Sequence, residues 1–361
     1  MLVVSRGEQA AQTTHANMGR YVVRRILQAI PLLIILSGGL FFLTSQMGDP
    51  VQMFAGRGGT LRKEDRERIT RRLGLDQPVY IQYLVWLIGN DWMQFDTNGD
   101  KIPDDRGTRR GVLRGDFGKS FATQQPVLQM IMERLPNTLI LMVTAEVVII
   151  LLSLLVGITS AVRQYSVFDN IATTASFVGY SFPIPLLAIA LIYIFGVNFK
   201  NWGWPYMPTV GMFEPSEGKT LSQVLWHLVL PVAALAMVSV AGYSRYVRAN
   251  MLEVMSQDYI RTARSKGLAE RVILFKHALK NAALPLVTLI GLDLPFLLAG
   301  AVVTETIFSW PGMGRLFYDH TVKSDFPVLM GILMLIAVAV IVFQILTDVI
   351  YTFLDPRIRY T

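Results

Sequence analysis

Long apolar runs, separated by short polar connections, dominate the sequence. Six of them reach the length of about 20 residues that a helix needs to cross the hydrocarbon core of a bilayer. They cover residues 26–45, 138–161, 171–197, 226–243, 284–308 and 328–353. The third run is the least regular, because Ser, Thr and Gly dilute it and Pro183 and Pro185 interrupt it. The pattern predicts an all-α polytopic membrane protein with six transmembrane helices.

Composition agrees with this prediction and excludes several other classes. The chain is 52% hydrophobic and only 16% charged, whereas charged residues make up about a quarter of an ordinary soluble domain. It contains no cysteine, so a disulfide framework and a thiolate metal site are both excluded. The first apolar run is long and no small-x-small site follows it, so it is expected to be a retained helix rather than a signal peptide.

The distribution of Lys and Arg predicts the orientation in the membrane. Fourteen of them lie at the termini and in the short connections on one side of the six runs, against four in the short connections on the other side. Positively charged connections stay in the cytoplasm, so both termini are expected there, and the basic net charge needs no nucleic acid to explain it. The predicted regions are a cytoplasmic tail (1–19), a first transmembrane helix (20–46), an external segment (47–136) with an acidic insert (90–114), a core of five transmembrane helices (137–354) and a second cytoplasmic tail (355–361).

A basic helix-loop-helix lies between the fourth and fifth apolar runs, and we call residues 249–283 the elbow. Asp258, with Ser256 as the alternative, is expected to cap a short helix. Gly267 is expected to end this helix in the left-handed conformation. A second helix is expected to start near Ala269 and to run on through Pro285. Such a compact, positively charged surface is suited to a soluble partner.

The external segment contains two patterns with open interpretations. Tyr80, Tyr83, Trp86 and Leu87 recur at helical spacing, which fits either packing against the membrane helices or a docking face for an external partner. An acidic turn within the insert fits either a calcium site or a solvated turn, since it offers oxygen ligands at alternate positions but lacks the glycine and bidentate glutamate of an EF-hand. The candidate calcium ligands are Asp96, Asn98, Asp100, Ile102 and Asp104.

Two carboxylates lie within apolar runs, Glu146 in the second and Asp293 in the fifth. A charged side chain at the bilayer centre costs about 2.5–3.5 kcal/mol on insertion scales, so each is expected to face other helices or a wet cavity. They are candidates either for lining a transport pathway or for structural hydrogen bonding. Glu305 and Asp348 lie near the ends of runs and are expected to reach water.

Motifs for catalysis and nucleotide binding are missing. Gly118-Lys119-Ser120 resembles the end of a phosphate-binding loop, but Leu113 stands where that motif requires glycine. The four histidines show no metal-ligand spacing, and no Ser-His-Asp arrangement can be singled out. The Trp310-Pro311-Gly312-Met313-Gly314 segment predicts a tight re-entry near the membrane surface, either a gate or a turn.

Several motifs together resemble the dipeptide/oligopeptide family of ABC (ATP-binding cassette) importer permeases, and specifically the first of its two membrane subunits. The strongest is Asp258-Tyr259-Ile260-Arg261-Thr262-Ala263-Arg264-Ser265-Lys266-Gly267-Leu268, which is followed by a match over 277–285. The chain departs from the generic importer motif by having Arg-Thr-Ala instead of Glu-Ala-Ala before the glycine. The other matching segments are 24–31, 73–76, 115–118, 134–136, 308–316 and 355–359.

The resemblance implies the type I ABC importer permease fold, with a long external segment between the first two helices. It also implies alternating access driven by ATP on other chains: a sister permease subunit, two ABC ATPase subunits and an external substrate-binding protein. The ATPase-coupling residues would be Asp258, Tyr259, Arg261, Ala263, Arg264, Lys266 and Gly267, and the cargo a peptide. Importers of the same type for nickel or oligosaccharides remain alternatives. A secondary transporter relaying protons through Glu146 and Asp293, or a membrane hydrolase, is less consistent with the motifs.

Overall fold

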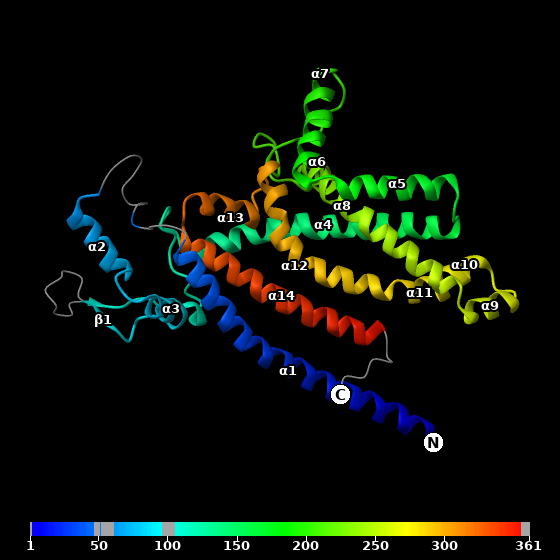
Figure 1. The fold of residues 1–361 in the computed structure, drawn as a ribbon, viewed down its shortest axis with the longest axis horizontal. Helices are drawn as coiled ribbons and strands as arrows, with labels where there is room; N and C mark the ends of the chain where they lie inside the picture. Colours follow the sequence, from blue (N-terminus) through cyan, green and yellow to red (C-terminus); the bar gives the residue numbers. More distant parts are fainter. Residues whose placement is uncertain (1, 47–50, 52–60, 96–104, 355–361) are drawn as a thin grey trace. The chain divides into compact units, whose positions relative to one another are not determined.

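The computed structural model describes residues 2–46, 51, 61–95 and 105–354. Helices predominate among these residues (Figure 1), and the chain divides into two compact units. The first unit comprises Met1–Arg25, Asn137–Gly314 and Val340–Thr361, and the second comprises Ile26–Pro136 and Arg315–Ala339. Three long helices, α1 (Leu2–Ser45), α4 (Val127–Val162) and α14 (Phe326–Leu354), contribute residues to both units.

Five helical stretches in the described part of the chain are long and apolar enough to cross a membrane. They are Gly19–Ser45 of α1, Val127–Val162 (α4), Ile184–Asn201, Leu221–Met255 (α8) and Phe326–Ile350 of α14. The remaining predicted run, 284–308, forms α12 (Leu284–Ile307), a helix of 24 residues. Each of the six apolar runs thus contributes a helix.

The third apolar run is divided at its prolines. It forms α5 (Val167–Ser181), then α6 (Ile184–Leu191), a π-helical turn (Ile192–Asn198) and α7 (Phe199–Asn201). Phe182 is extended, with φ −82° and ψ 129°, because a residue that precedes proline is disfavoured from the α region. The membrane-length stretch therefore starts at Ile184 rather than at residue 171.

Two helices extend beyond the predicted boundaries. Helix α1 begins at Leu2 and includes the predicted N-terminal tail, where no proline interrupts it. Helix α4 begins at Val127 and continues through Pro136. Internal prolines are tolerated in helices of this kind because neighbouring groups satisfy the freed backbone carbonyls.

Helix α8 is the centre of the first unit. It contacts α5, α6, α12 and α11 (Leu279–Ala282). Leu141 and Ala145 of α4 and Leu228 and Leu235 of α8 belong to one buried apolar cluster. At Gly157, a Cβ would lie only 2.7 Å from the Ser244 carbonyl oxygen, so α4 and α8 approach each other more closely there than any larger residue would allow.

The second unit includes α2 (Lys63–Leu73), α3 (Val79–Ile88) and a two-stranded antiparallel pair of β1 (Gln94–Phe95) and β2 (Asp105–Arg106). On α3, Tyr83 lies with its hydroxyl 2.9 Å from the Ser37 hydroxyl of α1. Phe41 of α1 contacts the rings of both Tyr83 and Trp86. These two members of the predicted stripe pack against a membrane helix, whereas Tyr80 is 66% exposed.

Candidate functional site

The elbow includes the last turns of α8, which ends at Met255, and its first short helix is α9 (Asp258–Ser265). The expected cap is wrong: the residue before the helix is Gln257, which is extended and provides no side-chain cap. Ser256 is helical at the end of α8, and its hydroxyl donates to the Glu253 carbonyl, 2.7 Å away. Asp258 is therefore the first helical residue, where its negative charge favours the positive end of the helix dipole.

The C-terminal end of α9 follows the sequence prediction. Gly267 has φ +73°. Its N–H donates to the Arg264 carbonyl, and the Leu268 N–H donates to the Ala263 carbonyl. This pair of bonds is a Schellman motif, in which a glycine in the left-handed region closes the helix. Because the space around Gly267 is open, backbone conformation rather than crowding requires glycine there.

Two residues of α9 attach the elbow to the rest of the first unit. Ile260 is fully buried and Ala263 is 7% exposed. Both belong to the apolar cluster that includes Met251 of α8 and Ile273. Ala263 thus faces inward, where its small side chain fits α9 against the chain itself, and its coupling role stays a prediction.

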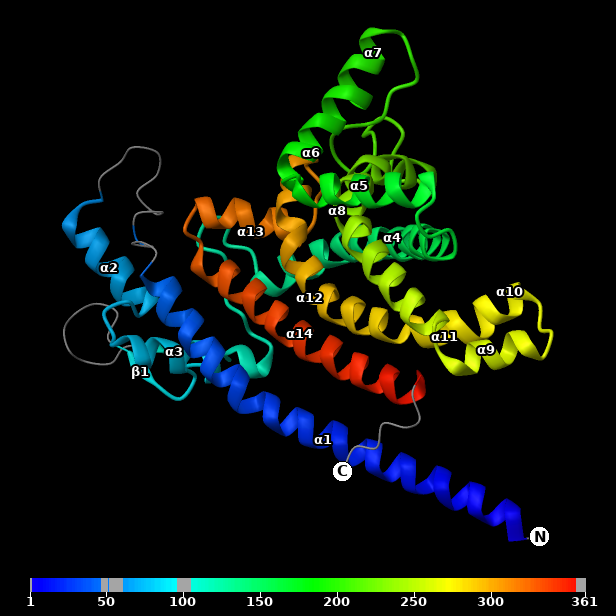
Figure 2. The ribbon, with the colours of Figure 1, turned by 45° about the vertical axis from the view of Figure 1, so that its right-hand side comes forward.

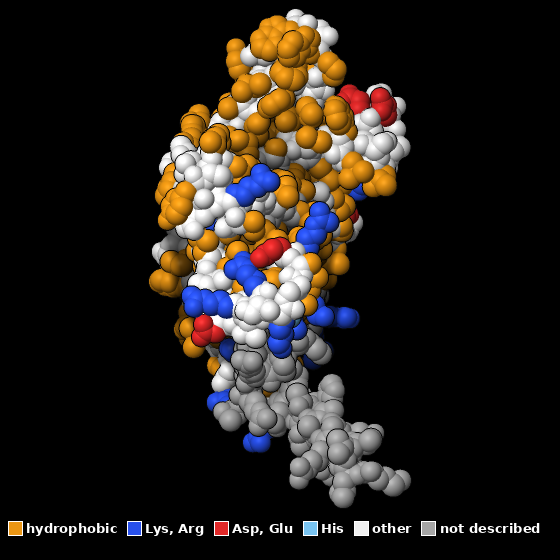
Figure 3. Space-filling view, turned by 90° about the vertical axis from the view of Figure 1, so that its right-hand side faces the viewer, with side chains coloured by type: hydrophobic (Ala, Val, Ile, Leu, Met, Phe, Trp, Pro, Cys, Tyr) orange, Lys and Arg blue, Asp and Glu red, His pale blue; other side chains and the backbone are white. Residues whose placement is uncertain are grey.

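The outer surface of the elbow combines positive charge with apolar side chains. The elbow contains six Lys and Arg against three Asp and Glu. Arg261 is 75% exposed at its side chain, and Arg264, 43% exposed, pairs with Glu270 at 2.8 Å. Lys and Arg side chains gather with polar and apolar ones on the face shown in Figure 3. The large hydrophobic side chains that the elbow exposes are Tyr259, Leu268, Val272 and Phe275.

The second limb of the elbow connects this surface to a membrane helix. It consists of α10 (Glu270–Val272), a π-helical turn (Ile273–Ala278) and α11, and α12 follows after Ala283. Figures 1 and 2 both show α9 and α10 at the end of α8 and α11. The predicted helix through Pro285 is therefore interrupted at Ala283, two residues before the proline. A force on the elbow can reach both α8 and α12.

The two membrane carboxylates lie in the same unit but have different surroundings. Glu146 is 6% exposed, and its Oε1 has no hydrogen-bond partner in the described part of the chain. Asp293 accepts a hydrogen bond of 2.5 Å from the Tyr243 hydroxyl of α8. Asp293 is therefore a hydrogen-bonded carboxylate, whereas one oxygen of Glu146 has no partner among the described residues.

The sequence comparison decides the family. The model described as "Binding-protein-dependent transport system inner membrane component" matches residues 149–360, more than half of the chain. The chain belongs to this family. A second model, for the N-terminal part of such membrane components, matches residues 18–142. The chain is thus a multi-pass inner-membrane component of a transport system.

Relatives of this transport component align over nearly its full length. The oligopeptide transport system permease protein AppB of Bacillus subtilis is 39% identical, with 95% of this chain and 100% of the relative covered. The dipeptide transport system permease protein DppB of Escherichia coli (strain K12) is 34% identical, with 95% and 99% covered. Among solved structures, the inward-facing MetNI methionine ABC transporter matches with a TM-score of 0.50 at 17% identity, over 64% of this chain and 99% of that chain. This last likeness concerns the fold.

The turn between α12 and α13 (Met313–Val322) of the transport component is held by buried, hydrogen-bonded side chains. Trp310 is fully buried and donates to the Asn137 carbonyl at 2.9 Å, so its ring packs inside the protein. Glu305 is also fully buried, contrary to the expectation that it reaches water, and accepts a 2.7 Å hydrogen bond from Thr138. Since a Cβ on Gly312 would collide with the Glu305 carboxylate, this turn requires glycine.

An ion pair that the sequence pattern did not single out joins α5 to α8. Arg248 donates two hydrogen bonds of 2.7 Å to the Asp169 carboxylate. These bonds hold the pKa of Asp169 below its ordinary value. A bidentate arginine pair fixes orientation as well as distance, so it sets how α5 lies against the helix that leads into the elbow. Asp169 and Arg248 are 79 positions apart, so no local sequence pattern indicates that they form a pair.

Asp348 is the second carboxylate expected to reach water. It accepts a 2.6 Å hydrogen bond from Tyr21 and lies 3.2 Å from an Arg25 nitrogen. Its side chain is 20% exposed, so it serves mainly to hold the middle of α1 against α14.

Ser120, His320 and Asp325 come together in the second unit. Ser120 Oγ donates to Asp325 Oδ2 at 2.5 Å, and His320 Nδ1 lies 2.9 Å from the same oxygen. In nucleophilic catalysis the serine hydroxyl donates its hydrogen bond to the imidazole, whereas the Ser120 hydroxyl donates to the carboxylate. All three side chains are also buried. The cluster joins residues 120–122 to the end of α13.

Candidate metal sites have two outcomes. The predicted calcium ligands, Asp96, Asn98, Asp100, Ile102 and Asp104, lie outside the described residues. The strands on either side of this segment, β1 and β2, pair with each other. In the described part of the chain no group of three or more His, Asp or Glu could hold a metal ion. Calcium binding by the acidic insert stays a prediction.

Proposed function

We propose that this transport component is a permease subunit of an ATP-driven ABC importer for dipeptides or oligopeptides. The peptide cargo is supported by the relatives that carry these names at 39% and 34% identity. The proposed complex contains a sister permease subunit, two ABC ATPase subunits and an external substrate-binding protein. ATP is bound and hydrolysed by the ATPase subunits, and this chain is not an enzyme.

The observation that carries the mechanism is the form of the elbow. A helix anchored by Ile260, closed by Gly267 and exposing basic and apolar side chains suits insertion into an acidic groove of an ATPase. Asp258, Tyr259, Arg261, Arg264 and Lys266 then form the contact surface. This assignment also requires the elbow and both termini to face the cytoplasm, in agreement with the Lys and Arg distribution.

Movement of the elbow drives alternating access. When two ATPase subunits close on ATP, the elbows of the two permeases approach each other. Because α8 and α12 continue from the two limbs of the elbow, these helices move with it and open the pathway to the external binding protein. Glu146 and Asp293 are candidates for the pathway wall.

A substitution at Gly267 tests the mechanical role. Gly267→Pro removes the N–H that donates to Arg264 and cannot adopt φ +73°. We expect ATP-driven peptide uptake to be lost while the sister permease still co-purifies. Gly218→Pro is the matched control, since Gly218 has φ +75° and its N–H donates to Glu214. Uptake at the wild-type rate by the Gly267→Pro complex would contradict the coupling role.

A secondary transporter is the second candidate function, because Glu146 is a buried carboxyl group with an unpaired oxygen. Such a transporter would stop when a protonophore collapses the proton gradient, and would continue without ATP. The importer is expected to behave in the opposite way in both assays. Nickel or oligosaccharide importers of the same type are distinguished by the solute that the external binding protein carries.

A further inference from the structure

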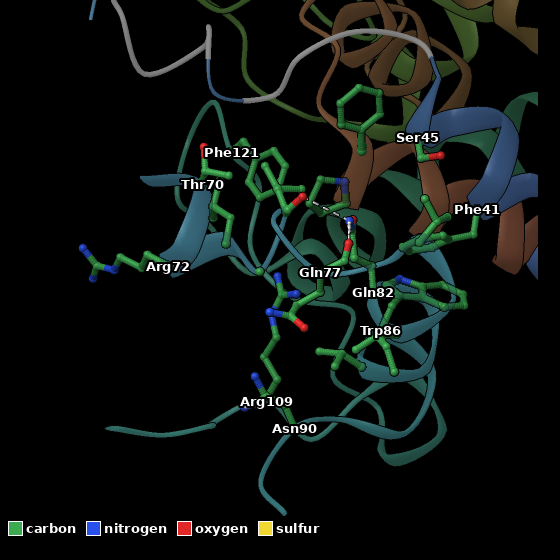
Figure 4. Close-up of a pocket in the computed structure, with 18 of the residues that line it drawn as sticks. Phe41, Ser45, Thr70, Arg72, Gln77, Gln82, Trp86, Asn90, Arg109 and Phe121 are labelled. Atoms are coloured by element: carbon green, nitrogen blue, oxygen red, sulfur yellow. Dashed lines mark hydrogen bonds between the residues drawn. The ribbon is translucent and has the colours of Figure 1, made fainter. Parts of the chain in front are cut away.

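The second unit contains a cavity of about 700 Å³, which is within the range of about 300–1,000 Å³ for ligand sites. Its walls come from the last turn of α1, from α2 and α3, from residues 106–121 and from the first turn of α14 (Figure 4). The cavity lies away from the elbow and from the membrane carboxylates in the sequence. No residue of the elbow, and neither Glu146 nor Asp293, lines the cavity.

The cavity is electropositive. The described residues that line it include no Asp or Glu. They include five arginines, which are Arg66, Arg71, Arg72, Arg106 and Arg109. Of these, Arg72 directs its guanidinium group away from the cavity (Figure 4), so it is not counted among the groups that face the space. Arg71 is partly neutralised by Glu67, 3.7 Å away. Since several guanidinium groups surround a partly enclosed space without a carboxylate in its wall, an anion is the favoured occupant.

Arg109 is the best placed of the five to bind that anion. Its backbone is fixed by Asn90, whose Oδ1 accepts from the Arg109 N–H at 2.9 Å and whose N–H donates to the Arg109 carbonyl at 3.0 Å. In the described part of the chain no carboxylate lies within ion-pair distance of its guanidinium. The nearby Asp116 carboxylate already accepts the N–H groups of Arg110 and Gly118. Burial lowers the pKa of Arg109, and Asp116 only partly opposes this.

A second, neutral donor in the cavity wall has no partner. The Trp86 side chain is 8% exposed, and its Nε1 lacks a hydrogen-bond partner in the described part of the chain. Its ring stacks on Tyr83. Buried donors are nearly always paired, so an unpaired indole N–H in the wall of a positively charged cavity indicates a ligand oxygen.

The position of the cavity indicates where the anion comes from. Phe41 and Ser45 belong to the last turns of α1, and Phe326 belongs to the first turn of α14. One membrane-length helix therefore ends at the cavity and another begins there. Trp and Tyr favour this depth, where lipid headgroups lie. In the turns of α1 that lead up to the cavity, large apolar side chains such as Ile35 (73%) and Leu43 (63%) are exposed. An acyl chain can lie along them.

We propose that this cavity binds the phosphate group of an anionic phospholipid, with the Arg109 guanidinium and the Trp86 Nε1–H as donors. Arginine matches the geometry of phosphate oxygens with two parallel hydrogen bonds. The acyl chains remain outside the cavity against α1. A soluble phosphate ester presents the same chemistry to these donors, and the test separates the two sources.

The test is native mass spectrometry of the detergent-solubilised full chain, titrated with phosphatidylglycerol. We expect Arg109→Gln to weaken retention of this lipid about tenfold, as for loss of a charge-assisted hydrogen bond. Trp86→Phe, which keeps the apolar ring, is expected to weaken it about threefold. Arg72→Gln is the matched control, because the Arg72 side chain points away from the cavity in Figure 4 and its loss should leave retention unchanged. A thermal unfolding curve without lipid checks that each variant is folded, and Arg109→Lys, which keeps the charge, replaces Arg109→Gln if the latter is not.

Competition experiments identify the source of the phosphate. Displacement only by phosphatidylglycerol, and not by glycerol phosphate, supports a lipid site. Displacement by glycerol phosphate at similar concentration supports phosphate recognition but assigns it to a soluble ester. The proposal is overturned if Arg109→Gln binds lipid as well as Arg72→Gln does, if phosphatidylcholine binds as tightly as phosphatidylglycerol, or if a dipeptide displaces the lipid. Because the assay measures binding without ATP or partner subunits, its failure leaves the proposed transport function untouched.

Discussion

Individual buried side chains determine the shape of the turns that join the membrane helices. In the turn after α12, Thr138 connects Glu305 to the backbone N–H of Met313 through hydrogen bonds of 2.7 Å. Gly312 leaves the space that the Glu305 carboxylate occupies. A methyl group there must displace a buried, hydrogen-bonded carboxylate.

We therefore expect Gly312→Ala to destabilise the protein by about 1–3 kcal/mol, the usual effect of overpacking. A thermal unfolding curve in detergent measures the effect. Gly39→Ala in α1 is the control, since no atom lies within 4 Å of its added methyl group. It should not lower the unfolding temperature, because alanine favours a helix interior over glycine. Equal unfolding temperatures for both variants would show that the buried Glu305 carboxylate does not restrict this turn.

Asp325 is a second buried residue with a measurable effect. Burial by itself raises the pKa of Asp325, but hydrogen bonds from His320, Ser120 and two backbone N–H groups outweigh it and hold the pKa below its ordinary value. A carboxyl group with a depressed pKa stabilises the fold above its unfolded pKa of about 3.9. This stabilisation is lost as the pH falls through the lower, folded value.

Asp325→Asn replaces an acceptor by a donor facing those N–H groups, and we expect it to destabilise the protein by about 1–3 kcal/mol at pH 7. Thermal unfolding of both proteins between pH 7 and pH 3 measures this. The difference in unfolding temperature should stay constant down to about pH 4 and narrow below it. A difference that grows with acidity would contradict the assigned pKa direction.

Among the helices, α9 transmits force only if it is held rigidly against its neighbours. Ile260 supplies most of this attachment, since it is fully buried in the cluster with Met251 and Ile273. We expect Ile260→Ala to destabilise the packing of α9 by about 2–5 kcal/mol. Limited proteolysis should then cut the elbow faster, and ATP hydrolysis by the assembled complex should no longer respond to the loaded binding protein.

The control for this variant is Tyr259→Ala, on the adjacent residue of the same helix. Tyr259 is 43% exposed, so its loss should leave the rate of proteolysis unchanged while weakening association with the ATPase. If both variants are cleaved equally fast, Ile260 does not anchor the elbow.

The sequence predicted those helical features that depend on local chemistry. Gly267 ends α9 as expected, because a left-handed residue has a strong local preference for glycine. The cap at Asp258 was predicted wrongly, because Ser256 caps the end of α8 by hydrogen bonding to Glu253, and Gln257 then precedes the first helical residue of α9. The inward orientation of Ala263 depends on contacts with α8, which no local pattern contains.

For the molecule as a whole, the apolar runs and the motifs were sufficient to predict a six-helix permease of the correct family. Features that join distant segments were not predictable from one sequence. The Asp169–Arg248 pair, the burial of Glu305 and the arginine-lined cavity around Arg109 each bring together residues that are far apart in the chain. The acidic turn at residues 96–104 lies outside the described residues, and its two interpretations, a calcium site or a solvated turn, stay open.

The account depends on one claim, that this chain moves its cargo only when ATP is hydrolysed by partner subunits that act on the elbow. The most direct measurement is uptake of a labelled dipeptide into liposomes that contain either the purified chain alone or the chain with its sister permease, both ATPases and the loaded binding protein. We predict uptake only by the complete assembly with ATP, and none by the chain alone. Uptake by the chain alone, without partners or ATP, would contradict the account.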